Sequence, residues 1–357
     1  MTTTTSLLHP DFLLLCRPEF TETLIEECRD KTTGAAELTS PAPGLILARC
    51  AGGPPAEPMV FERQRLIAPE FFPSDSLKPI TPETAARVLG PLVAATPLWT
   101  LHAISLEEEM EGGNEATSLP KRLEGIWNTV VRLGRKSAPD LEKRMRPPHR
   151  LKSGGIVVQA LMLRDGLWIS REQIHTMVQH RPGGESRMKW DDAAPSRSFL
   201  KMEEAIDQMP VDPVAGERVI DLGAAPGGWT YSFIKRGCDV IAVDHGPMKL
   251  PPHQDGWGSV EHRRENGITF EAPRNWPHVD WLVGDMLIAP GVALGLLRRW
   301  LEPGKARRLV LNIKLPQEHP YAAIQPVEKL LREQSAFAFR IRQLYHDRRE
   351  VTVMAWR

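Results

Sequence analysis

The residues best suited to chemistry in this sequence surround a glycine-rich turn between an apolar run and a helical pattern. Residues 219–222 read as a buried strand, residues 223–228 (Gly-Ala-Ala-Pro-Gly-Gly) as a tight turn, and residues 229–235 as the start of a helix. In an open α/β sheet a ligand lies at such a strand end, because helix amides and glycine backbone leave room for it. The turn therefore predicts a nucleotide-like ligand.

The spacing within the turn argues against a dinucleotide. The fingerprint G-x-G-x-x-G needs glycine at its middle position, where this chain has Ala225. A dehydrogenase is disfavoured for the same reason. The pattern is instead D-x-G-x-x-P-G-G, with Asp221 near the end of the strand. That form suits a smaller, cationic nucleoside ligand better than it suits a pyrophosphate.

Acidic and amide side chains follow the next two strands of the same half. Asp244 comes 23 residues after Asp221, the offset at which an acid accepts hydrogen bonds from ribose hydroxyls. Glu265 and Asn266 follow a third strand or loop, where a polar side chain meets an adenine amino group; the choice between the two stays open. These positions predict how a nucleoside would be held.

Two further charged residues end the fourth and fifth strands. Asp285 ends the fourth strand and Lys314 the fifth, and all these strand ends should face one crevice. A lysine that closes a buried strand is awkward in a purely structural role. Burial near other cations makes a lysine easier to deprotonate, as a general base at neutral pH requires. Lys314 is therefore the candidate base.

The second half of the chain alternates apolar runs with helical patterns, which predicts parallel strands joined by crossover helices. The runs are short and uninterrupted, as expected for strands covered on both faces. The predicted fold class is α/β, a doubly wound, Rossmann-like sheet with a C-terminal antiparallel hairpin. The strands are expected over 219–222, 239–244, 279–285, 308–314, 337–345 and 350–356, and a helix over 196–207.

The first half reads as a mixed α+β module. A turn-rich linker over residues 180–196 places the boundary near 182, which predicts an N-terminal domain over 1–182 and a second domain over 183–357. Strands are expected over 12–16, 44–50, 59–66 and 98–104, a hairpin over 155–163 and 167–170, and helices over 18–30, 83–95 and 120–133.

Charge is the most informative feature of that module. Residues 121–152 carry ten Lys or Arg against three acids, in a chain of 357 residues whose formal net charge is +0. Clustered basic residues release counterions from a nucleic-acid backbone, which favours an RNA or DNA surface, but a solvated helix face is equally open. The ten are Lys121, Arg122, Arg132, Arg135, Lys136, Lys143, Arg144, Arg146, Arg150 and Lys152.

Composition favours a cytoplasmic protein. The four cysteines show no C-x-x-C pair and no zinc spacing, so neither a disulfide framework nor a metal site is expected. Residues 1–10 form a polar end without the basic and apolar regions of a signal peptide. No apolar run approaches the length that spans a membrane.

The residues around the turn and the strand ends resemble the FtsJ-type RNA ribose 2′-O-methyltransferases. The likeness rests on residues 196–201, 221–229, 243–244, 284–286, 312–316 and 349–353. Those enzymes use S-adenosylmethionine and a Lys-Asp-Lys-Glu tetrad, which implies Lys201, Asp285, Lys314 and Glu350 as catalytic residues. The cofactor-binding residues that the likeness and the strand ends imply are Ser198, Asp221, Gly223, Ala225, Pro226, Gly227, Gly228, Trp229, Asp244, Asn266 and Asp285.

A second set of matches is narrower. Residues 14–18, 194–198, 244–248 and 343–347 are similar to bacterial members that methylate a cytidine ribose in 23S rRNA and carry a THUMP-type RNA-binding domain. The resemblance implies 23S rRNA as the partner, naked or in a large-subunit precursor, and neither DNA nor a membrane. It also implies a THUMP-like N-terminal module. The likeness is dense from residue 196 onward and thinner over the first 180 residues.

Other functions fit less well. A methyltransferase acting on an exocyclic nitrogen usually carries Asn/Asp-Pro-Pro-Tyr after the fourth strand, where this chain has Gly-Asp-Met-Leu at 284–287. A cytosine C5 enzyme needs a nucleophilic cysteine, and Cys238 follows a helix away from the crevice. A non-catalytic RNA-binding or ribosome-assembly protein that kept the fold remains the alternative, although it has no need of the four tetrad positions.

Overall fold

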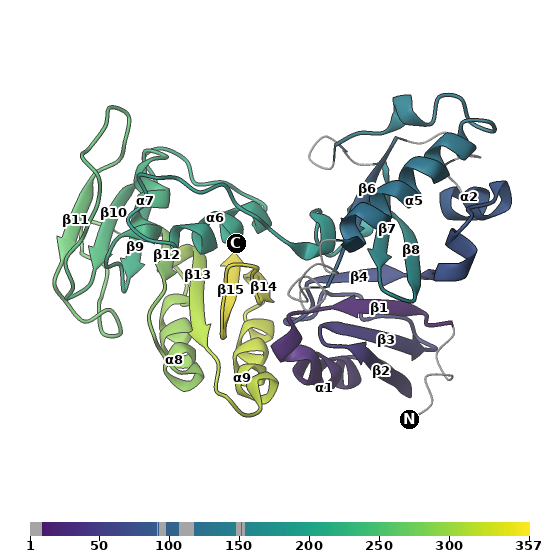
Figure 1. Cartoon of the computed structure of the whole chain (residues 1–357). Helices are drawn as coiled ribbons and strands as arrows, with labels where there is room; N and C mark the ends of the chain where they lie inside the picture. Colours follow the sequence, from purple (N-terminus) through teal and green to yellow (C-terminus); the bar gives the residue numbers. More distant parts are fainter. Residues whose placement is uncertain are drawn as a thin grey trace. The chain divides into compact units, whose positions relative to one another are not determined.

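The structure, a computed structural model, describes residues 9–90, 92, 98–106, 118–147, 151, 154–276 and 278–357. It divides into two compact units, Met1–Glu185 and Ser186–Arg357, the second beginning close to the boundary expected near 182 (Figure 1). No helix within the described ranges is long and apolar enough to cross a membrane.

The second unit is built on one seven-stranded sheet in the order β11-β10-β9-β12-β13-β15-β14. The first five strands in this order are parallel, whereas β15 runs antiparallel to both β13 and β14 (Figure 1). The predicted α/β sheet with its antiparallel hairpin is confirmed. The strands are β9 (Arg218–Leu222), β10 (Asp239–Val243), β11 (Val260–Arg263), β12 (Val279–Gly284), β13 (Ala306–Lys314), β14 (Ala338–Arg342) and β15 (Glu350–Trp356).

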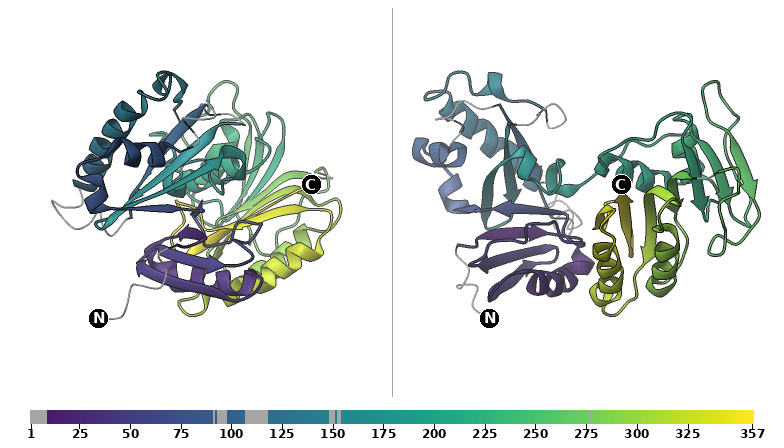
Figure 2. Two further views of the ribbon diagram at one scale, coloured as in Figure 1. Left: turned by 90° about the vertical axis from the view of Figure 1, so that its right-hand side faces the viewer. Right: turned by 180° about the vertical axis from the view of Figure 1, so that it is seen from behind.

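Helices cover this sheet. One apolar cluster joins α6 (Phe199–Gln208) and α7 (Gly228–Ile234) to sheet residues such as Val219 and Trp281. Helix α8 (Pro290–Trp300) packs against β13 and against α9 (Pro320–Glu333), and the two helices lie side by side in Figure 2. Along the chain from β10 to β12, the described residues contain no helix. Residues 246–258 hold several prolines and glycines, which interrupt helices.

The first unit contains two four-stranded sheets. The order β2-β3-β1-β4 forms an antiparallel sheet, and the order β5-β8-β7-β6 forms a mixed one. The helices are α1 (Thr21–Lys31), α2 (Pro82–Leu89) and α5 (Ser118–Gly134). The strands are β1 (Phe12–Leu15), β2 (Ala36–Ala42), β3 (Leu45–Cys50), β4 (Gln64–Ile67), β5 (Glu70–Pro73), β6 (Trp99–Ile104), β7 (Ile156–Met162) and β8 (Gly166–Gln173).

The expected strand over 59–66 is wrong in its first half, because β4 begins only at Gln64. The backbone amide of Met59 donates to the Glu62 carboxylate, and those of Val60 and Phe61 donate to the buried Glu27. These amides bind side chains instead of a neighbouring strand. The apolar run at 59–61 is therefore buried in a loop.

Two strands and one helix end also differ from expectation. Strand β2 is largely exposed and contains Pro41 at the sheet edge. It therefore lacks the alternation of apolar and polar residues from which a strand is predicted. The short strand β5 was likewise not expected. The helix expected over 83–95 ends at Leu89, where Gly90 adopts a positive φ; residues 91 and 93–97 lie outside the described residues.

Replacing Trp281 by alanine should lower the free energy of unfolding by about 3–5 kcal/mol, since it empties the centre of the sheet. The indole is 0% exposed and its Nε1 donates to Glu217 at 2.7 Å. Leu287→Ala is the matched control, because that side chain is 82% exposed and should change stability by less than about 0.5 kcal/mol. Urea unfolding followed by circular dichroism measures both; equal effects would contradict the core assignment.

Candidate active site

The glycine-rich turn lies between β9 and α7, at the carboxyl edge of the sheet. Gly227 has φ +115°, a conformation that side chains rarely adopt. A Cβ on Gly228 would lie 2.4 Å from Ser198 Oγ and 2.9 Å from the backbone nitrogen of Phe199. The turn therefore needs glycine both for its conformation and for its contact with the start of α6.

Asp221, one of the expected cofactor ligands, is almost completely buried, at 1% exposure. Thr230 Oγ1 donates to its Oδ2 at 2.6 Å, whereas Oδ1 has no hydrogen-bond partner among the described residues. Burial raises the pKa of the Asp221 carboxyl to about 7. A buried carboxylate oxygen without a donor is costly unless a ligand or ion compensates it.

The other expected nucleoside ligands are tied to the backbone of the same edge. Asp244 accepts the backbone N–H of Ala225 at 3.1 Å and that of Gly246 at 2.7 Å, which links the turn to the end of β10. Asn266 Oδ1 accepts the backbone N–H of Ile268, and both Asn266 and Glu265 are exposed. Asp244 is thus rigidly held, and the Asn266 and Glu265 side chains are open to solvent.

Trp229 faces the interior. Its side chain is 2% exposed within the apolar cluster of α6 and α7, and its Nε1 donates to the Ser198 backbone oxygen at 2.9 Å. Ser198 Oγ lies 2.8 Å from Ser196 Oγ. The indole therefore supports the segment before α6 rather than the ligand side of the turn.

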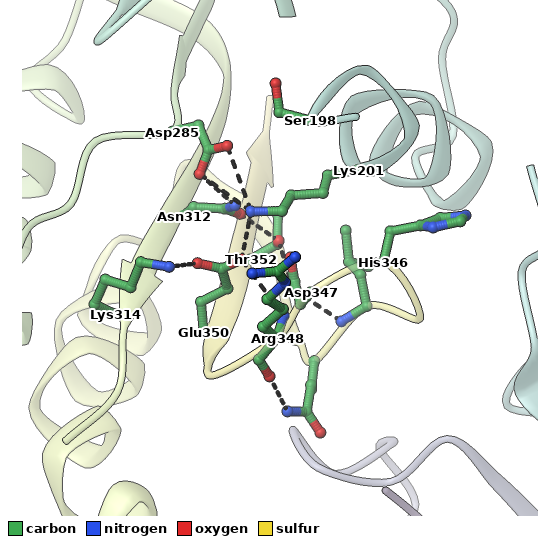
Figure 3. Close-up of polar contacts among 12 residues, drawn as sticks. Ser198, Lys201, Asp285, Asn312, Lys314, His346, Asp347, Arg348, Glu350 and Thr352 are labelled. Atoms are coloured by element: carbon green, nitrogen blue, oxygen red, sulfur yellow. Dashed lines mark hydrogen bonds and ion pairs between the residues drawn. The ribbon is translucent and has the colours of Figure 1, made fainter. Parts of the chain in front are cut away.

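Four charged side chains from four places in the chain converge (Figure 3). They lie near this turn, since Met286, the residue after Asp285, is packed against Gly223. Lys201 Nζ on α6 lies 3.4 Å from both carboxylate oxygens of Asp285, which follows β12. Lys201 also donates to Glu350 Oε1, and Lys314 donates to Glu350 Oε2. Lys314 ends β13 opposite Glu350, the first residue of β15. The sequence-predicted tetrad is thus one connected cluster, hereafter the tetrad cluster.

The four groups differ in burial. The side chain of Glu350 is 1% exposed, those of Lys201 and Asp285 are 14% and 18% exposed, and that of Lys314 is 37% exposed. The sequence favoured a buried Lys314, but its side chain is partly exposed at the end of β13. It is the member of the tetrad cluster that an incoming substrate can reach most easily.

Charge in the tetrad cluster is shared unequally. Burial opposes ionisation of Glu350, but hydrogen bonds from Lys201 and Lys314 outweigh it and lower the pKa of the carboxyl. Burial also opposes the charge of Lys201, yet Asp285 and Glu350 raise the pKa of its ammonium. Burial raises the pKa of Asp285 against the effect of Lys201. Lys201 is therefore held firmly as a cation.

Three polar residues that the sequence reasoning missed lie behind the tetrad cluster. Asn312 Nδ2 donates to Asp285 Oδ1 at 2.8 Å, and Thr352 Oγ1 lies 2.6 Å from Asn312 Oδ1 and 3.0 Å from Asp347 Oδ2 (Figure 3). A signal existed, since Asn312 and Thr352 are polar residues within two apolar strands. Their pairing across β13 and β15 is visible only in the sheet.

Cys238 offers no alternative nucleophile. It is 0% exposed, its Sγ contacts the Val214 oxygen at 3.3 Å, and burial raises the pKa of the thiol to about 12. A thiol with so high a pKa is a poor nucleophile.

The basic stretch at 121–152 is partly used inside the first unit. Arg144 is buried and donates to the Leu92 oxygen at 3.0 Å, Arg135 pairs with Glu142, and Arg122 donates to Ser74 Oγ at 2.5 Å. Arg150 and Lys152 lie outside the described residues. The exposed basic residues of the described stretch are Lys121, Arg132, Arg135, Lys136 and Lys143, of which Arg135 is the one paired with Glu142.

Comparison with known proteins places the chain in a family. Residues 194–317 match the family model of FtsJ-like methyltransferases. The Haemophilus ducreyi protein named ribosomal RNA large subunit methyltransferase M is 30% identical over 95% of this chain and 96% of its own length. This chain belongs to the ribosomal RNA large subunit methyltransferase M family. The predicted methyltransferase class is thereby confirmed.

Relatives of the same name match to different extents. The Alkalilimnicola ehrlichii protein is 36% identical over 68% of this chain and 71% of its own length. The Marinomonas protein is 42% identical over 48% of this chain, and the match spans about half, 51%, of its own length. Among solved structures, magnesium protoporphyrin IX methyltransferase from Synechocystis covers 45% of this chain and 80% of its own, with 13% identity and a TM-score of 0.33. That structural likeness is too weak to support an argument.

S-adenosylmethionine is the cofactor that membership in an FtsJ-like methyltransferase family implies. The residues at the turn fit that group. Asp221 Oδ1 is buried and lacks a partner among the described residues, as expected for an acceptor that awaits a cationic or hydroxyl-bearing ligand. Asp244 holds the backbone of the same turn.

Asp221 should make stability depend on pH. Its folded-state pKa of about 7 lies above the ordinary value of 3.8, so the folded state binds the proton more tightly and stability falls as pH rises from about 4 to 7. Asp221→Asn removes that loss. In cofactor-free protein, the free energy of unfolding of the variant relative to that of the natural protein should rise by up to ~4 kcal/mol over this interval. Above pH 7 the difference should stay constant.

Asp255→Asn, at an exposed position, serves as the control and should follow the natural protein at every pH. If the free energy of unfolding changed with pH in the same way for Asp221→Asn and the natural protein, the pKa of the Asp221 carboxyl would not be raised.

Proposed function

We propose that this chain transfers a methyl group from S-adenosylmethionine to the ribose 2′-hydroxyl of a cytidine in 23S rRNA. The single observation that supports this most is the convergence of Lys201, Asp285, Lys314 and Glu350 beside the glycine-rich turn. A binding protein has no need to bring two lysines and two carboxylates together at a strand edge, where a cluster of charges is costly to desolvate.

The cofactor side is assigned to the turn and the neighbouring strand ends. The cofactor supplies a methyl group on a positively charged sulfur. We assign Asp221 and the backbone of residues 223–228 to its amino-acid portion, with Ser198 at the edge of the turn. Asp244 would accept from the ribose hydroxyls, and Asn266 would meet the adenine. The buried, unpartnered Asp221 Oδ1 supports the first assignment.

The acceptor side is assigned to the tetrad cluster, with Lys314 as the general base. In the step, the 2′-hydroxyl would give its proton to Lys314 Nζ as its oxygen takes the methyl group, and the bound cofactor would supply that methyl group and keep the electron pair of the bond to sulfur. Lys314 must therefore enter the step as a neutral amine. Its exposure supports this role, because the substrate can reach it.

The sharing of Glu350 explains why Lys314, rather than Lys201, would lose its proton. Lys201 contacts two carboxylates, those of Asp285 and Glu350. Lys314 contacts only Glu350 in the part of the chain that the structure describes. The carboxylate charge available to Lys314 is thus already divided with Lys201. Lys201 would orient the hydroxyl, and Asp285 and Glu350 would fix the geometry.

We assign residues 1–182 to a THUMP-like RNA-binding domain and residues 183–357 to the methyltransferase domain. The exposed basic residues on and after α5 support an RNA contact, because each phosphate neutralised by Lys or Arg releases counterions. The name of the relatives supports ribosomal RNA as the substrate.

Lys314→Ala should reduce single-turnover methyl transfer by at least ~100-fold, since a positioned base contributes 10²–10⁴-fold. Cofactor binding, measured by calorimetry, should stay unchanged. Transfer is followed from labelled cofactor to 23S rRNA that lacks the modification. The control is Lys329→Ala on the exposed side of α9; near-normal transfer by Lys314→Ala would overturn the base assignment.

The methylated nucleotide should be a single cytidine ribose. Alkaline hydrolysis of the product rRNA, which leaves the bond after a 2′-O-methyl intact, maps it to one position. An active enzyme that modifies a base nitrogen would contradict the tetrad assignment, and no transfer to rRNA at all would favour the non-catalytic alternative.

A further inference from the structure

Behind the tetrad cluster lies a chain of hydrogen-bonded side chains that do not take part in the proposed proton and methyl transfer. It runs from Asp285 through Asn312 and Thr352 to Asp347 (Figure 3). Asn312 is 1% exposed, and Thr352 and Asp347 are 0% exposed. Bulk solvent does not reach these side chains, so each buried donor and acceptor needs a hydrogen-bond partner.

The direction of this chain follows from counting hydrogens. Asp285 lies 3.4 Å from the Lys201 ammonium through both oxygens, as a carboxylate does, and accepts from the Asn312 amide group. Asn312 Oδ1 can then only accept, and the neighbour at 2.6 Å is Thr352 Oγ1. A threonine hydroxyl has one hydrogen. Once that hydrogen is given to Asn312, Thr352 Oγ1 can only accept from Asp347 Oδ2 at 3.0 Å.

We propose that Asp347 is a neutral carboxylic acid that donates its proton to Thr352, and that the chain Asp347–Thr352–Asn312 positions Asp285 in the tetrad cluster. Each link then has one donor and one acceptor. If Asp347 were ionised, two oxygens without a hydrogen between them would face each other at 3.0 Å in a buried site.

Burial and charge around Asp347 agree with this count. Its Oδ1 has no hydrogen-bond partner among the described residues, and Oδ2 accepts the backbone N–H of Leu344 at 3.0 Å. Burial, followed by the Glu350 charge, raises the pKa of the carboxyl well above its usual range, and Lys201 opposes this.

The charged groups that face Asp347 come from two elements and from its own loop. Helix α6 contributes Lys201 and Glu204, and β15 contributes Glu350. His346 and Arg348 flank it in the chain. Glu204 accepts the backbone N–H groups of Tyr345 and His346, so the loop that carries Asp347 is itself fixed to α6.

A neutral Asp347 preserves the charge balance of the tetrad cluster, which holds two ammonium groups and two carboxylates. A third negative charge would hold the lysine protons more tightly and oppose their loss. Neutral Asp347 therefore orients Asp285 through two side chains without stabilising the protonated base. This positioning role rests on the proposed methyl transfer, whereas the protonation state of Asp347 does not.

Infrared spectroscopy tests the protonation state without any activity measurement. At pH 9, where Asp221 is ionised, the folded natural protein should show the carbonyl stretch of a carboxylic acid, and carboxyl-¹³C aspartate labelling should shift that band. Asp347→Asn should lack it. Absence of a label-sensitive acid band in the natural protein would overturn the proposal, and that measurement needs no variant to fold.

Steady-state kinetics tests the positioning role. Asp347→Asn keeps a neutral donor to Thr352 but loses the acceptor of the Leu344 N–H, so it should lower stability while the folded protein retains kcat within about threefold. Thr352→Val breaks the chain and should lower kcat by ~10- to 100-fold with unchanged KM for rRNA. Thr352→Ser restores the hydroxyl and should restore kcat. An unchanged kcat in folded Thr352→Val would exclude the positioning role; a natural protein without activity would instead contradict the proposed function.

Discussion

The candidate site depends on one buried carboxylate, that of Glu350, which two lysine ammonium groups share. A buried carboxylate is unfavourable unless cations and donors surround it. Glu350 receives both Lys201 and Lys314, and the Arg348 backbone N–H lies 3.4 Å from its Oε1. These partners belong to α6, to β13 and to the hairpin loop. One side chain therefore ties together the elements from which the tetrad cluster is built.

The direction of the last strand makes this arrangement possible. Strand β15 runs antiparallel to β13, so the first residue of β15, Glu350, pairs with the last residue of β13, Lys314. A parallel strand in the same place would put its first residue at the opposite edge of the sheet. The same antiparallel pairing sets Thr352 opposite Asn312. Both the charged contacts and the polar chain behind them thus follow from a single reversal of strand direction.

The first unit shows how little a charge count says without a fold. Residues 121–152 hold ten basic side chains, yet Arg144 and Arg122 donate to groups within the unit and Arg135 pairs with an acid. A long basic side chain often serves local structure, since its stem packs on apolar surface. The charge left for a nucleic-acid phosphate is smaller than the stretch itself indicates.

Local patterns by themselves determined most of the second unit. The apolar runs that end at or near Asp221, Asp244, Asp285 and Lys314 specify buried parallel strands, and such strands must present their carboxyl ends at one edge. The glycine-rich turn and the resemblance indicate a methyltransferase from the sequence alone, and family membership confirms that class. The first unit was less readable, because Glu27 and Glu62 bind backbone amides that the sequence assigned to a strand.

The tertiary structure decided what the charged groups do to one another. It brought Lys201 and Glu350, 149 residues apart, into contact, and it left Lys314 partly exposed where burial was expected. It also closed a chain of hydrogen bonds from Asp285 to Asp347. The sequence shows residue types and local periodicity, whereas burial and donor–acceptor pairing arise from strand order and register, which bring together residues far apart in the chain.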